Sequence, residues 1–251
     1  IELGDSNDDE IHKMASTFNE MLDTVEEVFI HEKQFSSDVS HELRTPITVI
    51  LAQSDYALQY SDTLEETKES LEVINRHAKR MTNLINQIME LSKLERQKEI
   101  EKEKINLSNI VLQLLEDYKP LLESKNLNLI YNVEKDIRIQ GNKIMLERVF
   151  LNILMNAVKF TKTNIEVSLT REDKTAVLKI RDNGIGISEE NKKFIWERFF
   201  QVNDSRNKEE NKGSGLGLSM VKKIVDLHSA TIDLESELEQ GTCFTIKFNM
   251  Q

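Results

Sequence analysis

Apolar residues recur at steps of three and four over most of the first hundred positions, which is the spacing of one face of an α-helix. The pattern runs from about residue 6 to Tyr60 and again over roughly residues 64–98. A short polar turn, Ser61-Asp62-Thr63, separates the two segments, and any of its side chains can cap the second helix. This part of the chain therefore predicts two long amphipathic helices that form an antiparallel hairpin.

The apolar seam of the second predicted helix is close to a heptad repeat, the pattern by which helices pack side by side. A hairpin alone buries little apolar surface, whereas two hairpins together make a four-helix bundle. We therefore expect a homodimer through residues about 31–98. The alternative is a hairpin that packs on its own C-terminal domain. The seam consists of Leu71, Ile74, Ala78, Met81, Ile85, Ile88 and Leu91.

Beyond a charged segment near residues 97–104 the pattern changes to alternating helices and strands. This order predicts a two-layer α/β sandwich, with its helices on one face of a mixed sheet. The expected helices are 107–125, 143–160, 188–198 and 215–228. The expected strands are 127–133, 137–140, 164–170, 175–182, 231–236 and 242–248. A polar stretch at 203–212 is typical of a lid or a disordered segment.

Composition narrows the classes of function. The net charge is −11, from 33 Lys and Arg against 44 Asp and Glu, and no basic stripe favours nucleic acid. The single cysteine, Cys243, excludes an internal disulfide and fits a reducing compartment. No apolar run approaches the roughly 20 residues that span a bilayer. Since the chain begins at Ile1 rather than Met, we expect a fragment, with any membrane segment upstream.

A histidine, an acid and a hydroxyl occur together in the first predicted helix, in Ser40-His41-Glu42-Leu43-Arg44-Thr45-Pro46. At about 100° per residue His41 lies roughly 200° from the apolar stripe, so it should face outward, and Thr45 shares its face. Pro46 lacks the N–H that would bond the carbonyl of Glu42, so it should bend the helix beside His41. The alternatives are a reactive site and a surface histidine near a kink.

Three clusters in the C-terminal part suit a nucleotide. Asn152 and Asn156 are four residues apart on a predicted helix, so their amide oxygens share a face and can bind Mg²⁺. Asp182 ends a predicted strand, where a carboxylate can accept a hydrogen bond from a base. A glycine-rich turn at 213–217 opens a predicted helix, whose N–H groups favour phosphate. Taken alone, the paired Asn residues are more typical of a polar surface and Asp182 of a strand-ending turn, and the glycine-rich turn is weak evidence.

Together, the order and spacing of these clusters resemble the ATP-binding domain (GHKL type) shared by histidine kinases, the Hsp90 chaperone, DNA gyrase and MutL. The heptapeptide and its hairpin resemble the dimerisation and phosphotransfer domain of sensor histidine kinases. Asp9-Glu10-Ile11 and the residues up to Met21 are similar to the second half of a HAMP linker. The resemblance implies four parts: a linker and signalling helix at 1–30, the phosphotransfer domain at 31–98, a hinge at 99–104 and the ATP-binding domain at 105–251.

The resemblance also implies residue roles. His41 accepts the γ-phosphoryl group of ATP, Glu42 acts as general base, and Thr45 positions water when a phosphorylated partner is dephosphorylated. Asn156 coordinates Mg²⁺, and Asp182 binds the adenine amino group. The other implied nucleotide-binding residues are Asn152, Lys159, Phe160, Gly184, Gly186, Gly213, Gly215, Leu216 and Gly217.

The implied function is that of the cytoplasmic catalytic portion of a sensor histidine kinase anchored in a bacterial membrane. Such a protein autophosphorylates His41 from Mg·ATP and passes the phosphoryl group to an aspartate of a response-regulator receiver domain. The resemblance also implies that the same protein dephosphorylates that regulator. Two other readings are a nucleotide-responsive scaffold and an ATPase of the chaperone or gyrase type, which would have no need of the His41 cluster.

Overall fold

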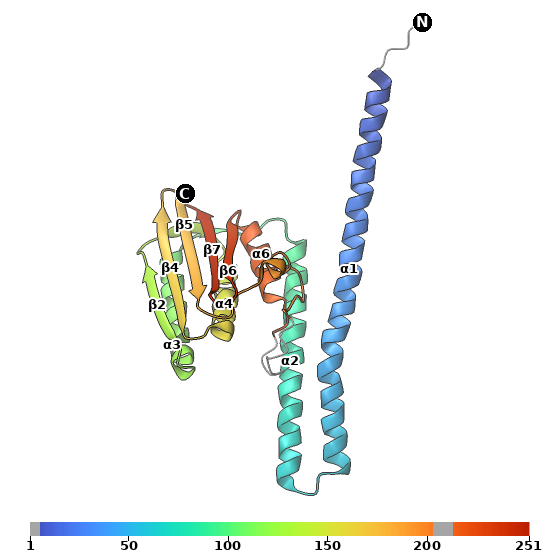
Figure 1. Cartoon of the computed structure of the whole chain (residues 1–251), viewed down its shortest axis with the longest axis vertical. Coiled ribbons are helices and arrows are strands. Elements are labelled where there is room, and N and C mark those ends of the chain that lie inside the picture. Colours follow the sequence, from blue (N-terminus) through green and yellow to red (C-terminus); the bar gives the residue numbers. More distant parts are fainter. Residues whose placement is uncertain (1–5, 203–212, 251) are drawn as a thin grey trace. The chain divides into compact units, whose positions relative to one another are not determined.

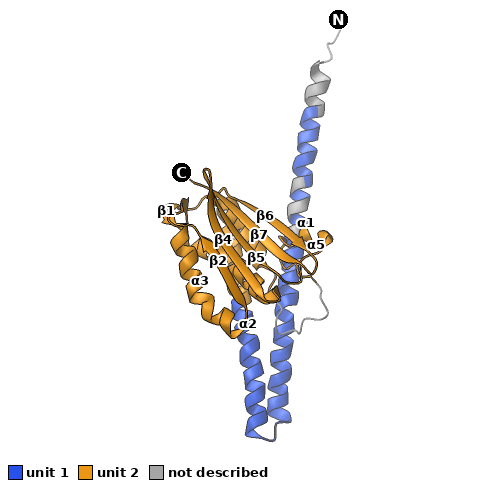
Figure 2. Cartoon of the chain, turned by 60° about the vertical axis from the view of Figure 1, so that its left-hand side comes forward, with its two compact units in different colours: residues 1–83 blue, residues 84–251 orange. Residues whose placement is uncertain are grey.

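The computed structural model describes residues 6–202 and 213–250, apart from the side chains of residues 6–12, 24, 27, 28 and 31. The predicted lid at 203–212 therefore lies outside the described residues, as do residues 1–5 of the segment similar to a HAMP linker. The chain divides into two compact units, residues 1–83 and 84–251, drawn in blue and orange in Figure 2. The division falls inside a helix rather than in the charged segment after it.

The predicted hairpin consists of α1 (Ser6–Gln59) and α2 (Leu64–Arg96), and within the first unit the two helices run in opposite directions (Figure 1). Thr63 caps α2, because its hydroxyl accepts a hydrogen bond from the N–H of Glu66 at 3.2 Å. The carboxylate of Glu66 in turn accepts from the N–H of Asp62 at 3.0 Å. These bonds satisfy N–H groups that the start of a helix leaves without intrahelical partners.

Helix α1 continues through Pro46, the residue that we expected to bend it. Pro46 is buried and Glu42, whose carbonyl loses its usual partner, is half-buried. His41 and Thr45 are exposed, as the helical period predicts. The proline therefore interrupts the hydrogen bonding next to His41 without ending the helix.

One apolar seam of α2 stays open to solvent within a single chain. Leu71, Ile85 and Met89 are 56%, 42% and 55% exposed, and their positions lie within about 40° of one another around the helix. Leu91, which the predicted seam included, is instead buried with Leu94 on the opposite face. Helix α2 thus has two apolar faces, only one of which is covered within the chain. Among the described residues, no helix is both long and apolar enough to cross a membrane.

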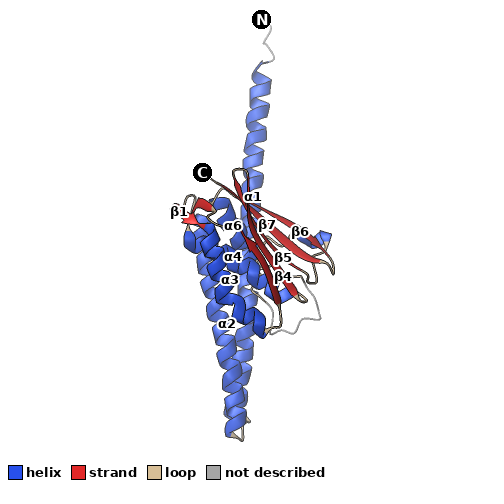
Figure 3. Ribbon diagram, turned by 90° about the vertical axis from the view of Figure 1, so that its left-hand side faces the viewer, coloured by secondary structure: helices blue, strands red, loops and turns tan. Residues whose placement is uncertain are grey.

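A five-stranded mixed sheet forms the second unit, in the order β2-β4-β5-β7-β6, with only β2 and β4 parallel. Helices α3, α4 and α6 cover one face of it (Figure 3). The predicted two-layer sandwich is therefore confirmed. The strands of this sheet are β2 (Asn128–Val133), β4 (Asn164–Glu172), β5 (Thr175–Asp182), β6 (Thr231–Glu237) and β7 (Gly241–Asn249). The helices are α3 (Leu107–Ser124), α4 (Lys143–Phe160), the short α5 (Glu189–Lys192) and α6 (Gly217–Leu227).

The core lies between the helices and the inner face of the sheet. Val167, Ile180 and Phe244 are neighbours across β4, β5 and β7, and all three are buried. The next residues, including Arg181, point to the other face because side chains alternate along a strand. Asp182 therefore returns to the inner face, at the end of β5, although it carries a charge.

Two elements differ from the prediction. The expected helix at 188–198 ends at Lys192, because Ile195 is buried and Trp196 packs edge-on against Phe244, with ring centroids 6.1 Å apart. These tertiary contacts override the local helical pattern after Lys192. In addition, the charged segment near 97–104 is partly ordered. Its end belongs to β1 (Glu103–Asn106), which pairs antiparallel with β3 (Arg138–Gly141).

Candidate functional site

Asp182 stands at the end of β5 with only 7% of its surface exposed. Its Oδ1 accepts a hydrogen bond from the N–H of Gly184 at 2.8 Å. Burial raises the pKa of the Asp182 carboxyl, and the backbone N–H groups of Gly184 and Thr242 offset part of that rise by favouring the charged form. The carboxylate of Asp182 is therefore buried at the end of β5 and held by backbone N–H groups, and an acceptor in that position suits recognition of an amino group.

The turn after Asp182 is packed tightly against the end of α4. A Cβ atom on Gly184 would lie 2.1 Å from the carbonyl oxygen of Phe160, so any side chain there would displace the backbone. The N–H of Ile185 donates to the same carbonyl at 3.3 Å. The structure thus brings together the predicted residues Asp182, Gly184 and Phe160. The contact with the turn is made by the backbone carbonyl of Phe160.

Asn183 fixes this arrangement, a role that we did not predict from the sequence. Its Oδ1 accepts hydrogen bonds from the N–H groups of Thr163 and Asn164 at 3.1 and 2.9 Å and from the hydroxyl of Thr161 at 2.9 Å. Its Nδ2 donates to the hydroxyl of Thr163 at 2.8 Å. One amide therefore ties the loop after α4 to the turn after β5. Its position between Asp182 and Gly184 is the only sequence signal that could have pointed to it.

The glycine-rich turn meets α4 at two points. The side chain of Asn152 lies against Gly217, where an added Cβ would come within 2.9 Å of Asn152 Oδ1. A Cβ on Gly213 would lie 3.6 Å from Lys159 Nζ, which itself sits over the Phe160 ring at 4.6 Å from the centroid. The predicted residues of α4 and of the turn therefore face each other.

At the start of α6, backbone N–H groups are open to a ligand. Among the described residues no side chain caps the helix at Leu216. The first N–H groups of a helix lack intrahelical partners and carry the positive end of its dipole. Gly215 has a φ of +72°, which bends the chain into the helix and which L side chains rarely adopt. This end of α6, with Lys159 nearby, favours a phosphate group.

The remaining predicted residues are placed as follows. Gly186 has a φ of +69° and lies against the carbonyl of Glu237, so it shapes the loop after the Asp182 turn. Asn156 is half-buried on α4, one helical turn beyond Asn152. His41, Glu42 and Thr45 lie on α1, in the other compact unit, where the Thr45 hydroxyl donates to the carbonyl of His41 at 3.4 Å.

No group of three or more His, Cys, Asp or Glu side chains in the described part of the chain could hold a metal ion. Asn156 does not depend on such a cluster. Mg²⁺ usually keeps several waters and takes only one or two protein ligands together with substrate phosphates. A single amide oxygen on α4, such as that of Asn156, therefore fits that ion.

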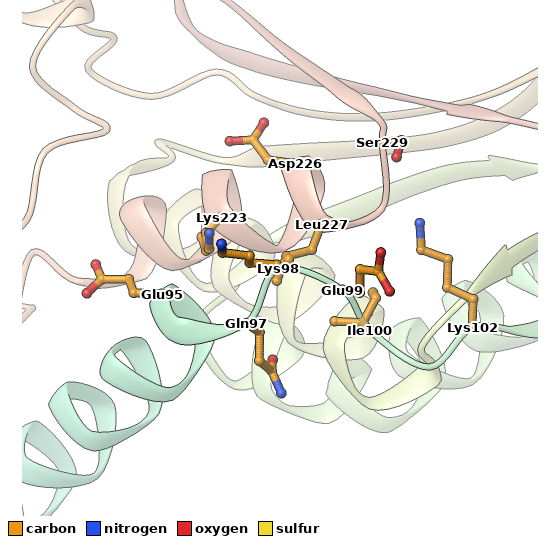
Figure 4. Close-up of a pocket in the computed structure, with 10 residues that line it drawn as sticks. All are labelled: Glu95, Gln97, Lys98, Glu99, Ile100, Lys102, Lys223, Asp226, Leu227 and Ser229. Carbon is orange, nitrogen blue, oxygen red and sulfur yellow. The ribbon is translucent and has the colours of Figure 1, made fainter. Parts of the chain in front are cut away.

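A cavity of about 810 Å³ lies elsewhere in the second unit, between the segment after α2 and the end of α6 (Figure 4). None of the predicted nucleotide-binding residues lines it. Its walls include Lys98, Lys102 and Lys223 together with Glu99 and Asp226, so positive and negative charges are mixed. The cavity therefore lies between the segment at 97–102 and the end of α6.

His228 joins the end of α6 to the start of α4. Its Nε2 accepts a hydrogen bond from the N–H of Asn142 at 3.0 Å, and its Nδ1 donates to the carbonyl of Ile224 at 2.7 Å. Burial lowers the pKa of His228; the bond to Ile224 opposes that shift, and the charge of Lys102 adds to it. A neutral ring is required, because a protonated Nε2 cannot accept the bond from Asn142.

We expect the second unit to lose stability as the pH falls. The folded pKa of His228 lies below the unfolded value of about 6.5, so the unfolded state binds more protons between the two values. The stabilisation is complete above about pH 6.5 and is lost as the pH falls through the folded pKa. Urea unfolding between about pH 7.5 and about pH 5 should measure this loss. The variant His228→Gln, which cannot titrate, should show a smaller dependence, and an unchanged dependence would contradict the assignment.

Comparisons with known proteins agree with this geometry. Residues 31–97 match the His Kinase A (phospho-acceptor) domain, and residues 141–251 match the histidine kinase-, DNA gyrase B- and HSP90-like ATPase family. Sensor histidine kinase YkoH of Bacillus subtilis is 30% identical over 253 residues, covering 100% of this chain and 55% of YkoH. Signal transduction histidine-protein kinase ArlS of Staphylococcus aureus is 32% identical over 247 residues, covering 97% of this chain and 54% of ArlS.

The chain therefore spans about half the length of the curated relatives it matches. Among solved structures, histidine kinase ThkA in complex with the response regulator protein TrrA has a TM-score of 0.71 at 22% identity. The match covers 87% of this chain and 61% of that one. At 22% identity, this structural similarity supports the fold alone, that is, a helical hairpin followed by an α/β domain.

Proposed function

Because this chain belongs to the sensor histidine kinases, with a phospho-acceptor domain followed by an ATPase domain, we propose that it transfers the γ-phosphoryl group of Mg·ATP to His41. The observation that carries the proposal is the meeting of three motifs in one domain. Asp182 and Gly184 pack on the end of α4, and α4 in turn packs on the glycine-rich turn.

In the proposed complex, a carboxylate oxygen of Asp182 accepts a hydrogen bond from the adenine amino group. Phe160 supplies an apolar surface near the base, and Gly184 and Gly186 shape that pocket. The N–H groups at the start of α6 bind the phosphates, with Lys159 contributing positive charge. The turn from Gly213 to Gly217 provides these N–H groups, and Asn152 supports it from α4.

Asn156 would hold Mg²⁺ through its amide oxygen. The chemistry that such an ion would supply there is neutralisation of phosphate charge. Asn152 lies one turn earlier, but its Nδ2 donates to the carbonyl of Arg148 at 3.1 Å and its Oδ1 faces Gly217. These contacts favour Asn156 rather than Asn152 as the ligand.

His41 is an exposed nucleophile on a rigid helix. In the proposed step a ring nitrogen of His41 forms a bond to the γ-phosphorus, the bond between that phosphorus and the leaving oxygen of ADP breaks, and Glu42 takes the ring proton. The carboxylate of Glu42 would hold the ring in one tautomer and stabilise the cation that develops. Thr45, on the same face, is suited to position water for the reverse chemistry on a phosphorylated regulator.

The exposed seam of α2 supports a homodimer through residues about 31–98. Leu71, Ile85 and Met89 are exposed apolar residues on one side of α2, which a second hairpin would cover. On α1, Ile47 and Leu51 are 41% and 58% exposed and lie four residues apart, so they share a face of that helix. The alternative partner, the chain's own C-terminal domain, contacts the opposite face of α2 instead.

The other partners are proposals of the same kind. A response-regulator receiver domain would accept the phosphoryl group on an aspartate, and the complex of ThkA with such a regulator supports this choice. Residues 1–30 would connect the catalytic portion to a membrane-anchored sensor upstream, as a HAMP linker does. The segment at 99–104 would act as a hinge, and the cavity beside Lys98 and Lys102 supports that movement.

The test is phosphorylation with γ-labelled ATP and Mg²⁺, comparing wild type with His41→Gln. We expect an acid-labile, base-stable label in wild type and none in the variant, because the variant lacks the ring nitrogen. Binding of a non-hydrolysable ATP analogue should be equal in both, since His41 lies outside the nucleotide site. Analogue binding without any label would instead favour a scaffold, and phosphate release unaffected by His41→Gln would favour a chaperone-type ATPase.

A further inference from the structure

The last turns of α2 belong to the ATP-binding unit and reach it through three polar contacts. Gln87 Oε1 accepts a hydrogen bond from the hydroxyl of Ser214 at 2.6 Å. Glu90 forms an ion pair with Arg148 of α4, and Glu95 forms one with Arg198 at 2.5 Å. The three contacts thus join the end of α2 to the glycine-rich turn, to α4 and to the segment after α5.

All three contacts lead to the glycine-rich turn. Ser214 is part of that turn. Arg148 accepts, through its carbonyl, the hydrogen bond from Asn152, whose side chain lies against Gly217. Arg198 directly precedes Phe199, whose N–H donates to the carbonyl of Gly215 at 3.1 Å. A single stretch of α2 therefore contacts the turn directly and its two supports.

Of the three contacts, the one between Gln87 and Ser214 acts directly on the glycine-rich turn, because it orients the Ser214 hydroxyl. A hydroxyl has one proton, and Ser214 Oγ also accepts a hydrogen bond from the N–H of Leu216 at 3.2 Å. Because Gln87 takes the proton, a lone pair of the hydroxyl stays directed at Leu216. That bond holds the turn at the point where it enters α6, next to the N–H groups proposed to bind phosphate.

We infer that Gln87 is a positioning residue for the nucleotide site, contributed by the helix of the phosphotransfer hairpin. It acts through Ser214 on the glycine-rich turn and does not itself touch ATP. The two ion pairs, whose side chains are 31–37% exposed, keep α2 in place for this contact. It follows that a shift of α2 which withdraws Gln87 loosens the turn and weakens ATP binding. The inference rests on the proposed function, since it concerns the same ATP site.

The experiment measures the affinity of the full chain for a non-hydrolysable ATP analogue with Mg²⁺ by calorimetry. Gln87→Met keeps the length and the helix propensity of the side chain but removes the acceptor. We expect a three- to tenfold weaker affinity, about the effect of one net hydrogen bond. Ser214→Ala should weaken binding similarly, and the double variant should be no weaker than either single variant. Asn86→Ala, at an exposed neighbouring position of α2, is the matched control and should bind as wild type does.

A structural effect on folding alone is excluded by two readouts. The double-variant comparison isolates the contact, because independent effects would add. Ser214→Thr retains the hydroxyl and should keep most of the affinity that Ser214→Ala loses. The comparison of these two Ser214 variants also tests the inference if Gln87→Met does not fold. Wild-type affinity in Gln87→Met, or additive losses in the double variant, would overturn the inference while leaving the ATP site standing. Failure of the wild-type chain to bind the analogue would overturn the proposed function and this inference together.

Discussion

Replacing Asp182 with Asn should weaken ATP binding about 100-fold, a loss of roughly 2.7 kcal/mol. Asn keeps an oxygen that can accept the bond from Gly184, so the turn after β5 survives. The second oxygen becomes an NH₂ group, however, and would face the adenine amino group with a donor where an acceptor is needed. Both groups then lose a partner in a buried site, which costs more than the absence of one favourable contact.

Calorimetry with the ATP analogue measures this loss, and thermal unfolding checks that the fold persists. Asp233→Asn is the control, because it removes the same charge from the outer face of the same sheet. The preference for ATP over GTP should also fall in Asp182→Asn. The guanine ring presents a carbonyl oxygen where adenine presents an amino group, and the NH₂ group of Asn can donate a hydrogen bond to that oxygen. Affinity for ATP within threefold of wild type would contradict the role given to Asp182.

Replacing Gly215 with Ala should destabilise the ATP-binding unit by at least about 2 kcal/mol and lower ATP affinity more than tenfold. The φ of +72° is costly for any L residue with a Cβ, by about 1–2 kcal/mol. The added Cβ would also lie 2.6–2.9 Å from backbone atoms of Phe199, which cannot move as a flexible side chain could. The turn would therefore shift and move the N–H groups that are proposed to bind phosphate.

The matched substitution is Gly213→Ala, two residues earlier in the same turn. The nearest atom to a Cβ there is the side-chain nitrogen of Lys159 at 3.6 Å, an ordinary contact. Urea unfolding should therefore show less than about 0.5 kcal/mol of change for Gly213→Ala. Equal destabilisation by the two variants would show that the special geometry of Gly215 is not the cause.

The local pattern was sufficient to predict most elements. Helix α4 and strand β5 have the bounds that the helical and alternating periods predict, because each has one continuous buried face. The predicted helix at 188–198 was wrong where Ile195 and Trp196 make tertiary contacts that override the local preference. Strand β1 was missed because its residues are mostly polar and exposed, and its pairing with β3 is a long-range contact.

The residues of the candidate site also fall into two groups, those that belong to a local motif and those whose role depends on contacts with other elements. Asp182, Asn156 and the glycines could be predicted because their motifs are local and occur in a known order. Asn183 and Gln87 could not, since their importance comes from partners on other elements: the loop after α4 for Asn183 and Ser214 for Gln87. A single sequence contains no signal for such contacts, whereas the spacing of a motif is visible in it.

Transfer of a phosphoryl group from ATP to His41 is tested most directly by mass-spectrometric mapping of the phosphorylated residue. The protein is kept at alkaline pH after reaction with Mg·ATP so that a phosphohistidine survives. We expect phosphate on the peptide that contains residues 40–46, assigned to His41. Phosphate on Ser40 or Thr45 of that peptide, on another histidine, or on no residue of a chain that binds ATP would contradict it.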